Sequence, residues 1–341
     1  MMFKKEKGKL IVIFFATFII VFMASVSSAI TFGPAVNMGS TVNTGADERF
    51  PDISSDALDL YLSSDRTGGS GLRDIYLSTR PDISSSFGLP SNLGVTINST
   101  VTDSAPSITS NNVALFFSSD RLSGSGSGDI WVSVLSGAPN NVGSVNTTAN
   151  DIAPDISPDG LTIFFTSDRS GGSGGNDIYM ATRSTIPGAF GTALNLTTIN
   201  TGFSDLGPTI SSDGLSLYFT SDRPGGFGGF DLYVSTRPDL ISYFGSGVNL
   251  GASINSSFNE MGPSISSDGS TLYYDSNRSG GFGGYDIYQS TAVPEPTTIL
   301  LLGMGLAGFA GVLVRRRFKR LNSSSTVSNI ISIQRNNSYL L

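Results

Sequence analysis

Short apolar runs alternate with turn residues along most of the chain. Between about residues 50 and 290 the apolar runs are short and rich in β-branched and aromatic residues, as in 161–165 and 215–219. Runs of this length and composition are typical of β-strands, and pairs such as Asp159-Gly160 favour tight turns between them. Because no part of this region keeps a helical period, the pattern predicts a meander of short antiparallel strands.

The same order of segments is repeated five times. Each copy has a proline phrase, an apolar run, Ser-Asp-Arg (Ser-Asn-Arg in the last copy), a Gly-rich loop and Asp-Ile-Tyr or a close variant. The proline phrases begin at Pro51, Pro106, Pro154, Pro208 and Pro263. The arginines recur at nearly the same spacing and are Arg66, Arg121, Arg169, Arg223 and Arg278. A further Phe-Gly…Asn segment, which lacks its Phe-Gly in the copy at Asn141, predicts a fourth strand for each repeat.

Four strands repeated about every 50 residues are the signature of β-propeller blades. One Phe-Gly segment precedes the first proline phrase, whereas none follows the last Asp-Ile-Tyr at 286–288. Residues 32–39 are therefore expected to join the last blade and close the ring. The sequence predicts an all-β, five-bladed propeller of four-stranded antiparallel blades, with a hydrophobic helix flanking it at each end. A six-bladed ring would need a sixth proline phrase, which the chain lacks.

The repeat resembles a known propeller motif. Residues 154–179 read Pro-Asp-Ile-Ser-Pro-Asp-Gly-Leu, then Phe-Phe-Thr-Ser-Asp-Arg and Asp-Ile-Tyr, and look like the WD-like repeat of the TolB type. The similarity extends over residues 32–291. It implies the fold but says little about function, because propellers serve as binders, scaffolds and enzymes.

The N-terminus has the three parts of a secretory signal peptide. Four lysines between positions 4 and 9 precede an apolar run over 10–26, and Ser27-Ser28-Ala29 supplies small residues at the −3 and −1 positions. We expect signal peptidase to cleave after Ala29. The alternative is an uncleaved anchor, because the length of the apolar run is near the lower limit for spanning a bilayer.

Near the other end, positions 297–314 form a long stretch without a charged residue. A basic cluster that includes Arg315, Arg316 and Arg317 follows it, and would stay on the cytoplasmic side if the stretch spans a membrane. Both termini then predict that the segment between them lies outside the cytoplasm.

The motif Pro294-Glu295-Pro296 stands just before this stretch. The order of Pro-Glu-Pro, Gly-rich apolar segment and arginine cluster resembles the PEP-CTERM sorting signal over about residues 293–320. The resemblance implies a Gram-negative exporter in which an exosortase-type membrane peptidase processes the tail, and such systems usually accompany exopolysaccharide and biofilm production. The family's chain normally ends soon after the arginines, whereas here residues 321–341 continue.

These signals divide the chain into four parts. They are a signal peptide (1–29), a propeller (30–292), a sorting and transmembrane segment (293–320) and a disordered polar tail (321–341). The expected location is the cell envelope, the outer surface or the extracellular matrix, after transient anchoring in the inner membrane.

Composition and charge then restrict the chemistry. The 341 residues contain no histidine and no cysteine, which excludes imidazole bases, thiol nucleophiles, disulfides and the usual zinc and iron sites. Residues 30–293 carry ten basic and 25 acidic residues, a net charge near −15, and no lysine. Since phosphate binding needs basic side chains, we expect no nucleic-acid partner. A cation or a neutral glycan fits this sign of charge.

Each repeat carries an acid at the third position before its proline. These acids are Glu48, Asp103, Asp151, Asp205 and Glu260. With the five arginines they suggest a repeated buried or half-buried ion pair that fixes the strand ends. The alternative is a ring of five carboxylates around one mouth of the channel, able to bind a divalent cation such as Ca²⁺. No other cofactor or metal site is expected.

Aromatic residues distinguish the Gly-rich loops of the last two repeats. Phe227 and Phe230 lie in the fourth loop and Phe282 and Tyr285 in the fifth, where the other loops have Ser, Leu, Arg or Asn. Exposed rings on adjacent loops can stack on sugars or anchor a protein partner. The alternative is packing against the neighbouring loop.

Two carboxylates break the symmetry of the repeats. Asp52 and Asp155 follow the proline where the other copies have Ser or Thr. Because glycoside hydrolases on five-bladed propellers place carboxylates in the channel, a carboxylate-dependent glycosidase or lyase is the alternative function. Near-uniform repeats favour a scaffold, so we predict a non-enzymatic exported binding module for exopolysaccharide or an envelope protein.

Overall fold

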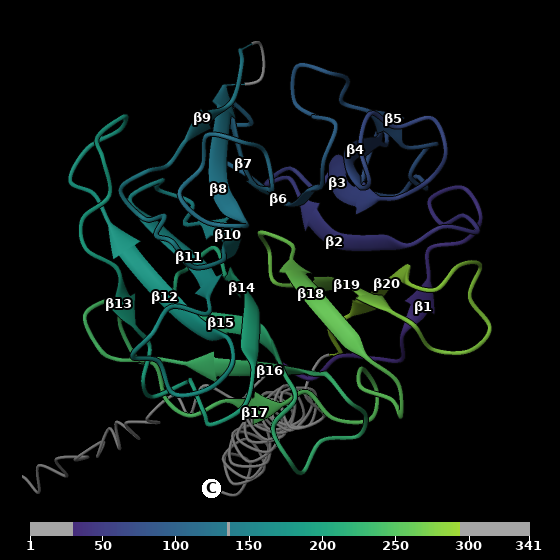
Figure 1. Ribbon diagram of the computed structural model, residues 1–341. Coiled ribbons are helices and arrows are strands. Elements are labelled where there is room, and N and C mark those ends of the chain that lie inside the picture. The colour runs from purple at the N-terminus through teal and green to yellow at the C-terminus, as the bar shows by residue number, and fades with distance from the viewer. Residues whose placement is uncertain (1–29, 135–136, 294–341) are drawn as a thin grey trace, which may run out of the picture.

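The computed structural model describes residues 30–134 and 137–293, which form five four-stranded antiparallel sheets around a central axis (Figure 1). The five-bladed all-β propeller predicted from the repeats is confirmed. Within these residues there is no helix, and so none that could cross a membrane. The two segments expected as flanking hydrophobic helices lie outside the described residues.

In each blade the strands follow one another from the axis outward. The inner strands are β2 (Glu48–Ile53), β6 (Asp103–Ile108), β10 (Asp151–Ile156), β14 (Asp205–Ile210) and β18 (Glu260–Ile265). The second strands are β3 (Asp59–Ser64), β7 (Ala114–Ser119), β11 (Thr162–Ser167), β15 (Ser216–Ser221) and β19 (Thr271–Ser276). The third strands are β4 (Asp74–Thr79), β8 (Asp129–Val134), β12 (Asp177–Thr182), β16 (Asp231–Thr236) and β20 (Asp286–Thr291). The short outer strands are β5 (Ser91–Asn92), β9 (Asn140–Asn141), β13 (Leu194–Asn195), β17 (Val248–Asn249) and β1 (Val36–Asn37). We number the blades 1 to 5 in the order of their inner strands.

The N-terminal segment completes blade 5, as predicted. β1 lies antiparallel to β20 and pairs with residues 288 and 289. A bridge between Phe32 and Ala292 extends this pairing. The Asn43 side chain also donates to the carbonyl of Ile287 at 3.0 Å and accepts its N–H at 2.8 Å. Because the first and last strands share one sheet, strand pairing closes the ring, and only short outer strands are left as blade edges.

Each inner strand has a bulge at its proline, where the register shifts. The residue before the proline has a positive φ in every blade: Phe50, Ala105, Ala153, Gly207 and Gly262. Glycine adopts this conformation without steric cost in blades 4 and 5, whereas alanine or phenylalanine costs about 1–2 kcal/mol there.

The bulge turns one backbone N–H toward the preceding blade. In blade 4 the Gly207 N–H donates to the Thr166 hydroxyl at 2.9 Å, and in blade 3 the Ala153 N–H donates to the Ser118 hydroxyl at 2.8 Å. At the junction of blades 5 and 1 the acceptor is instead the buried carboxylate of Asp275, which the Phe50 N–H reaches at 2.9 Å. Each bulge therefore stabilises a contact between neighbouring blades.

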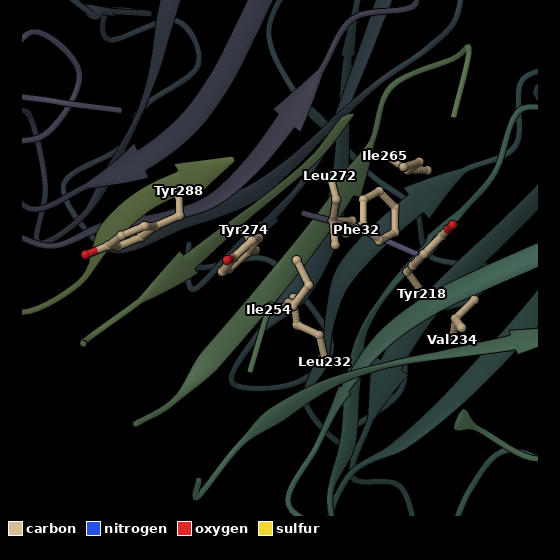
Figure 2. Close-up of a cluster of buried hydrophobic side chains, with 9 residues drawn as sticks. All are labelled: Phe32, Tyr218, Leu232, Val234, Ile254, Ile265, Leu272, Tyr274 and Tyr288. Atoms are coloured by element: carbon tan, nitrogen blue, oxygen red, sulfur yellow. The ribbon is translucent and has the colours of Figure 1, made fainter. Parts of the chain in front are cut away.

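The hydrophobic core lies between the blades. Figure 2 shows the cluster between blades 4 and 5, in which the Phe32 ring meets Tyr218 edge-on with centroids 6.3 Å apart. Phe87, Phe190 and Phe244, from the same position in other repeats, make equivalent edge contacts with a neighbouring blade. The regular recurrence of the Phe-Gly segment thus positions one aromatic side chain in each of these interfaces.

Candidate functional site

The loops divide between two faces of the ring. The antiparallel strand order places the Gly-rich loops, and the segments that precede the inner strands, on one face. We call it the Gly-loop face. The turns between first and second strands lie on the opposite face with the crossovers to the outer strands, and we call this the turn face.

The five acids before the prolines form ion pairs within their own blades. In blade 4 the Arg223 Nη2 atom donates to Asp205 Oδ1 at 2.6 Å, and the N–H and hydroxyl of Thr201 donate to Oδ2 at 2.6 and 2.9 Å. All five carboxylates are fully buried. The equivalent pairs are Glu48–Arg66, Asp103–Arg121, Asp151–Arg169 and Glu260–Arg278.

The arginine of each pair is held on its other sides as well. Arg223 donates to the Ser221 hydroxyl and to the Ile199 carbonyl, both at 2.9 Å, and lies over the rings of Phe219 and Tyr233. The hydrogen bonds compensate both charges where the carboxylate is shielded from water. This is the geometry of a structural ion pair.

The alternative, a ring of carboxylates that binds Ca²⁺, does not match this arrangement. None of Glu48, Asp103, Asp151, Asp205 and Glu260 lines either cavity on the axis. In residues 30–134 and 137–293 no three acidic side chains gather as metal ligands would. The acids lie apart because each one faces the arginine of its own blade.

The Gly-rich loops are fixed by the aspartates that begin the third strands. Asp231 accepts the N–H groups of Phe227 and Gly228 at 2.6 and 3.2 Å. At the start of the loop Asp222 accepts the Ser204 N–H at 2.7 Å, and Asn277 makes the same bond in blade 5. Such capping gives the loops a defined backbone. The side chains at their tips are therefore presented on a rigid support.

The aromatic residues of these loops lie on adjoining segments of the Gly-loop face. Phe227 and Phe282 are each 50% exposed, while Phe230 and Tyr285 are half-buried. The loop of blade 4 contacts the segment before β18, where the Phe230 N–H donates to Asn259 Oδ1 at 3.0 Å. Asn259 in turn donates to the Tyr285 hydroxyl at 3.1 Å, which links the two aromatic loops.

The structure adds two aromatic side chains that the sequence pattern did not single out. Phe203 and Phe258 are 45% and 39% exposed and lie in the segments before β14 and β18. The same position holds Ala46, Val101 and Ala149 in blades 1 to 3. An alignment of all five repeats at this position would have revealed them. We call these six residues the aromatic patch: Phe203, Phe227, Phe230, Phe258, Phe282 and Tyr285.

Tyr285 differs from the other members of the patch because it also has a structural role. The Arg49 guanidinium lies 4.0 Å from the centre of its ring. Arg49 also lies 3.3 Å from Asp275 across the junction of blades 5 and 1. Burial raises the pKa of Asp275, and Arg49 together with the Phe50 N–H opposes that rise. Phe227 and Phe282, which are more exposed, are the better variants for testing binding.

Asp52 and Asp155 lie at equivalent positions on the axis and are almost fully buried. Each accepts a backbone N–H from the next blade, Asp52 from Ile108 at 2.7 Å and Asp155 from Ile210 at 2.8 Å. In blades 2 and 5 the hydroxyls of the equivalent serines accept the same bond at 3.1 Å. The two carboxylates therefore take part in the contacts that join the blades.

Burial also raises the pKa of both carboxyl groups. It raises the pKa of Asp52 to about 7, against the opposing effects of its hydrogen bonds to Ile108 and Ser264. Burial raises the pKa of Asp155 well above its usual range, and the nearby charge of Asp52 raises it further. The cavities on the axis that these residues line have volumes of about 20 and 70 Å³. Such volumes accommodate water molecules but not a sugar ring.

Comparisons with known proteins identify one sequence motif and the fold. The PEP-CTERM protein-sorting motif matches residues 292–317. The Pro294-Glu295-Pro296 and Arg315–Arg316–Arg317 elements of that motif lie outside the described residues, as do the predicted signal peptide and its predicted cleavage site after Ala29. No curated protein matches the chain.

Solved structures with the same fold include a thermostable family-43 glycoside hydrolase, at 14% identity and a TM-score of 0.52 over 75% of this chain and 97% of that one. The chain is also similar to TolB from Acinetobacter baumannii, at 19% identity and a TM-score of 0.46 over 77% of this chain. It spans about half of that TolB, 55% of its length. A third similar structure is the putative TolB from Agrobacterium tumefaciens, at 16% identity and a TM-score of 0.48 over 78% and 92% of the two chains. At these identities the similarity shows the fold alone.

Proposed function

We propose that this five-bladed propeller with a PEP-CTERM sorting motif is an exported, non-enzymatic binding module at the cell surface or in the extracellular matrix, and that its aromatic patch binds neutral polysaccharide. The main support for this proposal is the concentration of exposed aromatic rings on blades 4 and 5. Sugars present apolar C–H faces that stack on the faces of such rings. The net charge of residues 30–293, near −15, disfavours a polyanionic polysaccharide.

Residues Phe227 and Phe282 provide the test of this proposal. We expect Phe227→Ser combined with Phe282→Ser to reduce retention of the full chain on exopolysaccharide by about tenfold, since each lost aromatic contact is worth about 0.5–1.5 kcal/mol. Affinity electrophoresis or a glycan array measures the retention. Leu122→Ser is the matched control, because Leu122 is an exposed apolar side chain on the Gly-rich loop of blade 2. Equal retention of the double variant and the parent would exclude the patch as the binding surface.

A glycosidase or lyase that uses Asp52 and Asp155 is the second candidate, favoured by the similarity of the fold to a glycoside hydrolase. The narrow axial cavities and the backbone hydrogen bonds of both carboxylates support the binding module instead. Activity on a panel of polysaccharides, compared between the parent and the Asp52→Asn and Asp155→Asn variants, separates the two. Cleavage of a polysaccharide, by hydrolysis or by elimination, that both variants lose would establish the enzyme.

Delivery is proposed to follow the sorting motif. Signal peptidase would cleave after Ala29, and an exosortase-type peptidase would process the chain near Pro294-Glu295-Pro296, after transient anchoring in the inner membrane of a Gram-negative cell. We expect the mature protein to begin at Ile30 and to lack Arg315 and everything after it. Intact-mass measurement of protein from the culture medium or outer surface checks both ends. A mature mass that retains residues 321–341 would contradict this processing.

No metal is part of the proposed function, because each of the five acids before the prolines already has an arginine partner. We expect millimolar Ca²⁺ to leave the thermal midpoint of the full chain unchanged. A midpoint that rises with Ca²⁺ and returns when a chelator is added would reveal a cation site.

A further inference from the structure

A cavity of about 650 Å³ lies between blades 2 and 3 on the turn face. Its walls are mainly apolar side chains of β7, β8 and the crossover of blade 3, among them Phe116, Val132, Val134, Ile186 and Phe190. Cavities of about 300–1,000 Å³ with such walls are typical of small-molecule sites. No residue of the aromatic patch lines this cavity, so a ligand bound here would be independent of the proposed polysaccharide site.

The corresponding groove between blades 3 and 4 is about half as large, at about 330 Å³. Two substitutions between the repeats explain part of the difference. Val132 in β8 takes the place of Met180 in β12, and Ala114 in β7 takes the place of Thr162 in β11. The smaller side chains on blade 2 thus leave the groove between blades 2 and 3 wider than the groove between blades 3 and 4.

Arg183 supplies the charged group of the cavity. Its Nε atom donates to the Gly160 carbonyl at 2.7 Å, and its guanidinium lies 4.5 Å from the centre of the Phe190 ring. The Nη1 atom makes a long bond of 3.4 Å to the Gly188 carbonyl. Among the described residues no carboxylate lies within ion-pair distance of Arg183. Asp159 also lines the cavity, but one of its oxygens accepts the Ser157 hydroxyl and the Leu161 N–H.

Comparison of the repeats shows how the sequence around this arginine differs, although none of the three equivalent arginines forms an ion pair within the described residues. Arg80 and Arg237 occupy the same position in blades 1 and 4, and each has an aspartate at the second position after it, Asp82 or Asp239. Blade 3 has Thr185 at that position. The wider groove is therefore also the one whose arginine lacks a neighbouring acid in its own crossover.

We infer that the cavity between blades 2 and 3 binds a small amphiphile with one carboxylate and an apolar body. The carboxylate would pair with the Arg183 guanidinium, and the apolar body would cover the side chains of Val132, Val134 and Ile186. Burying that body removes apolar surface from water, which favours binding, and a charge-assisted hydrogen bond orients it. This inference does not depend on the proposed polysaccharide site, which lies on the opposite face.

Three ligands of equal length separate the contributions of tail and charge. We expect octanoate to bind the full chain in isothermal titration calorimetry. Octanol and octylamine have the same tail without the negative charge, and we expect their binding to be weaker by about tenfold or more. Equal binding of all three ligands, or no binding of octanoate, would overturn the inference.

Variants that copy the neighbouring repeats test the same residues without removing the fold. Thr185→Asp restores the acid of blades 1 and 4 and should weaken octanoate binding about tenfold, as should Arg183→Gln. Val132→Met copies Met180 and should weaken octanoate and octanol alike, because it fills the cavity. Arg237→Gln in blade 4 is the control and should change neither. If Arg183→Gln fails to fold, Thr185→Asp still decides, and unchanged octanoate affinity in that variant contradicts the role of Arg183.

Discussion

Replacing Asp205 with alanine should lower the free energy of unfolding by about 3–5 kcal/mol, the usual cost of breaking a buried ion pair from one side. The variant leaves the Arg223 guanidinium and two donor groups of Thr201 facing a cavity with no acceptor. Urea titration followed by circular dichroism measures the loss. Trp131, the single tryptophan and buried in blade 2, reports whether a lesion in blade 4 destabilises the whole ring.

Two control variants make this result specific to the ion pair. Asp205→Glu copies the acid that blades 1 and 5 use at the same position, so it should lose less than about 1.5 kcal/mol. Asp213→Ala removes an exposed turn aspartate of the same blade, for which about 1 kcal/mol is expected. A loss in Asp205→Ala no larger than that of Asp213→Ala would show that the pair contributes little.

Asp52→Asn should make the propeller more stable than the parent above pH 7. The pKa of Asp52 is about 7 in the folded protein, against 3.8 as the ordinary value. A group with a raised pKa in the folded state gives its full stability below the unfolded value, and this stability is lost as the pH rises through the folded value. A difference of about three pKa units corresponds to roughly 4 kcal/mol, an order-of-magnitude figure for a buried carboxylate.

The asparagine variant keeps an acceptor for the Ile108 N–H but has no proton to lose. Its unfolding free energy should therefore fall less than that of the parent between pH 5 and pH 8, as measured by urea titration at both values. Because the charge of Asp52 also raises the pKa of Asp155, the double variant Asp52→Asn, Asp155→Asn should show a non-additive effect. The same pH dependence in parent and single variant would contradict the buried state of Asp52.

Much of the fold was predictable because the same sequence pattern occurs in five repeats. Five proline phrases indicated the number of blades, and the position of the Phe-Gly segment before the first phrase predicted that residues 32–39 close blade 5. Pairing of acids with arginines was also predictable in kind. That each pair forms within one blade was not, since it depends on the direction in which the carboxylate leaves the inner strand.

The functional residues were only partly predictable for a similar reason. Phe227 and Phe282 stand out in the sequence because they interrupt glycine-rich loops, whereas Phe203 and Phe258 belong to the segments before the inner strands and join them on one face through the fold. The positive φ before each proline and the cavity beside Arg183 depend on contacts between blades. Spacing along one repeat does not specify such contacts.

The pairing of β1 with β20 imposes an order on assembly. The polypeptide is synthesised from its N-terminus, so the first strand has no partner until the last strand of the ring has been made. Contacts between segments so far apart in the chain form late and slowly. A chain that stops before β20 leaves β1 and the last strand made without a pairing partner. The architecture itself therefore distinguishes a finished chain from a truncated one.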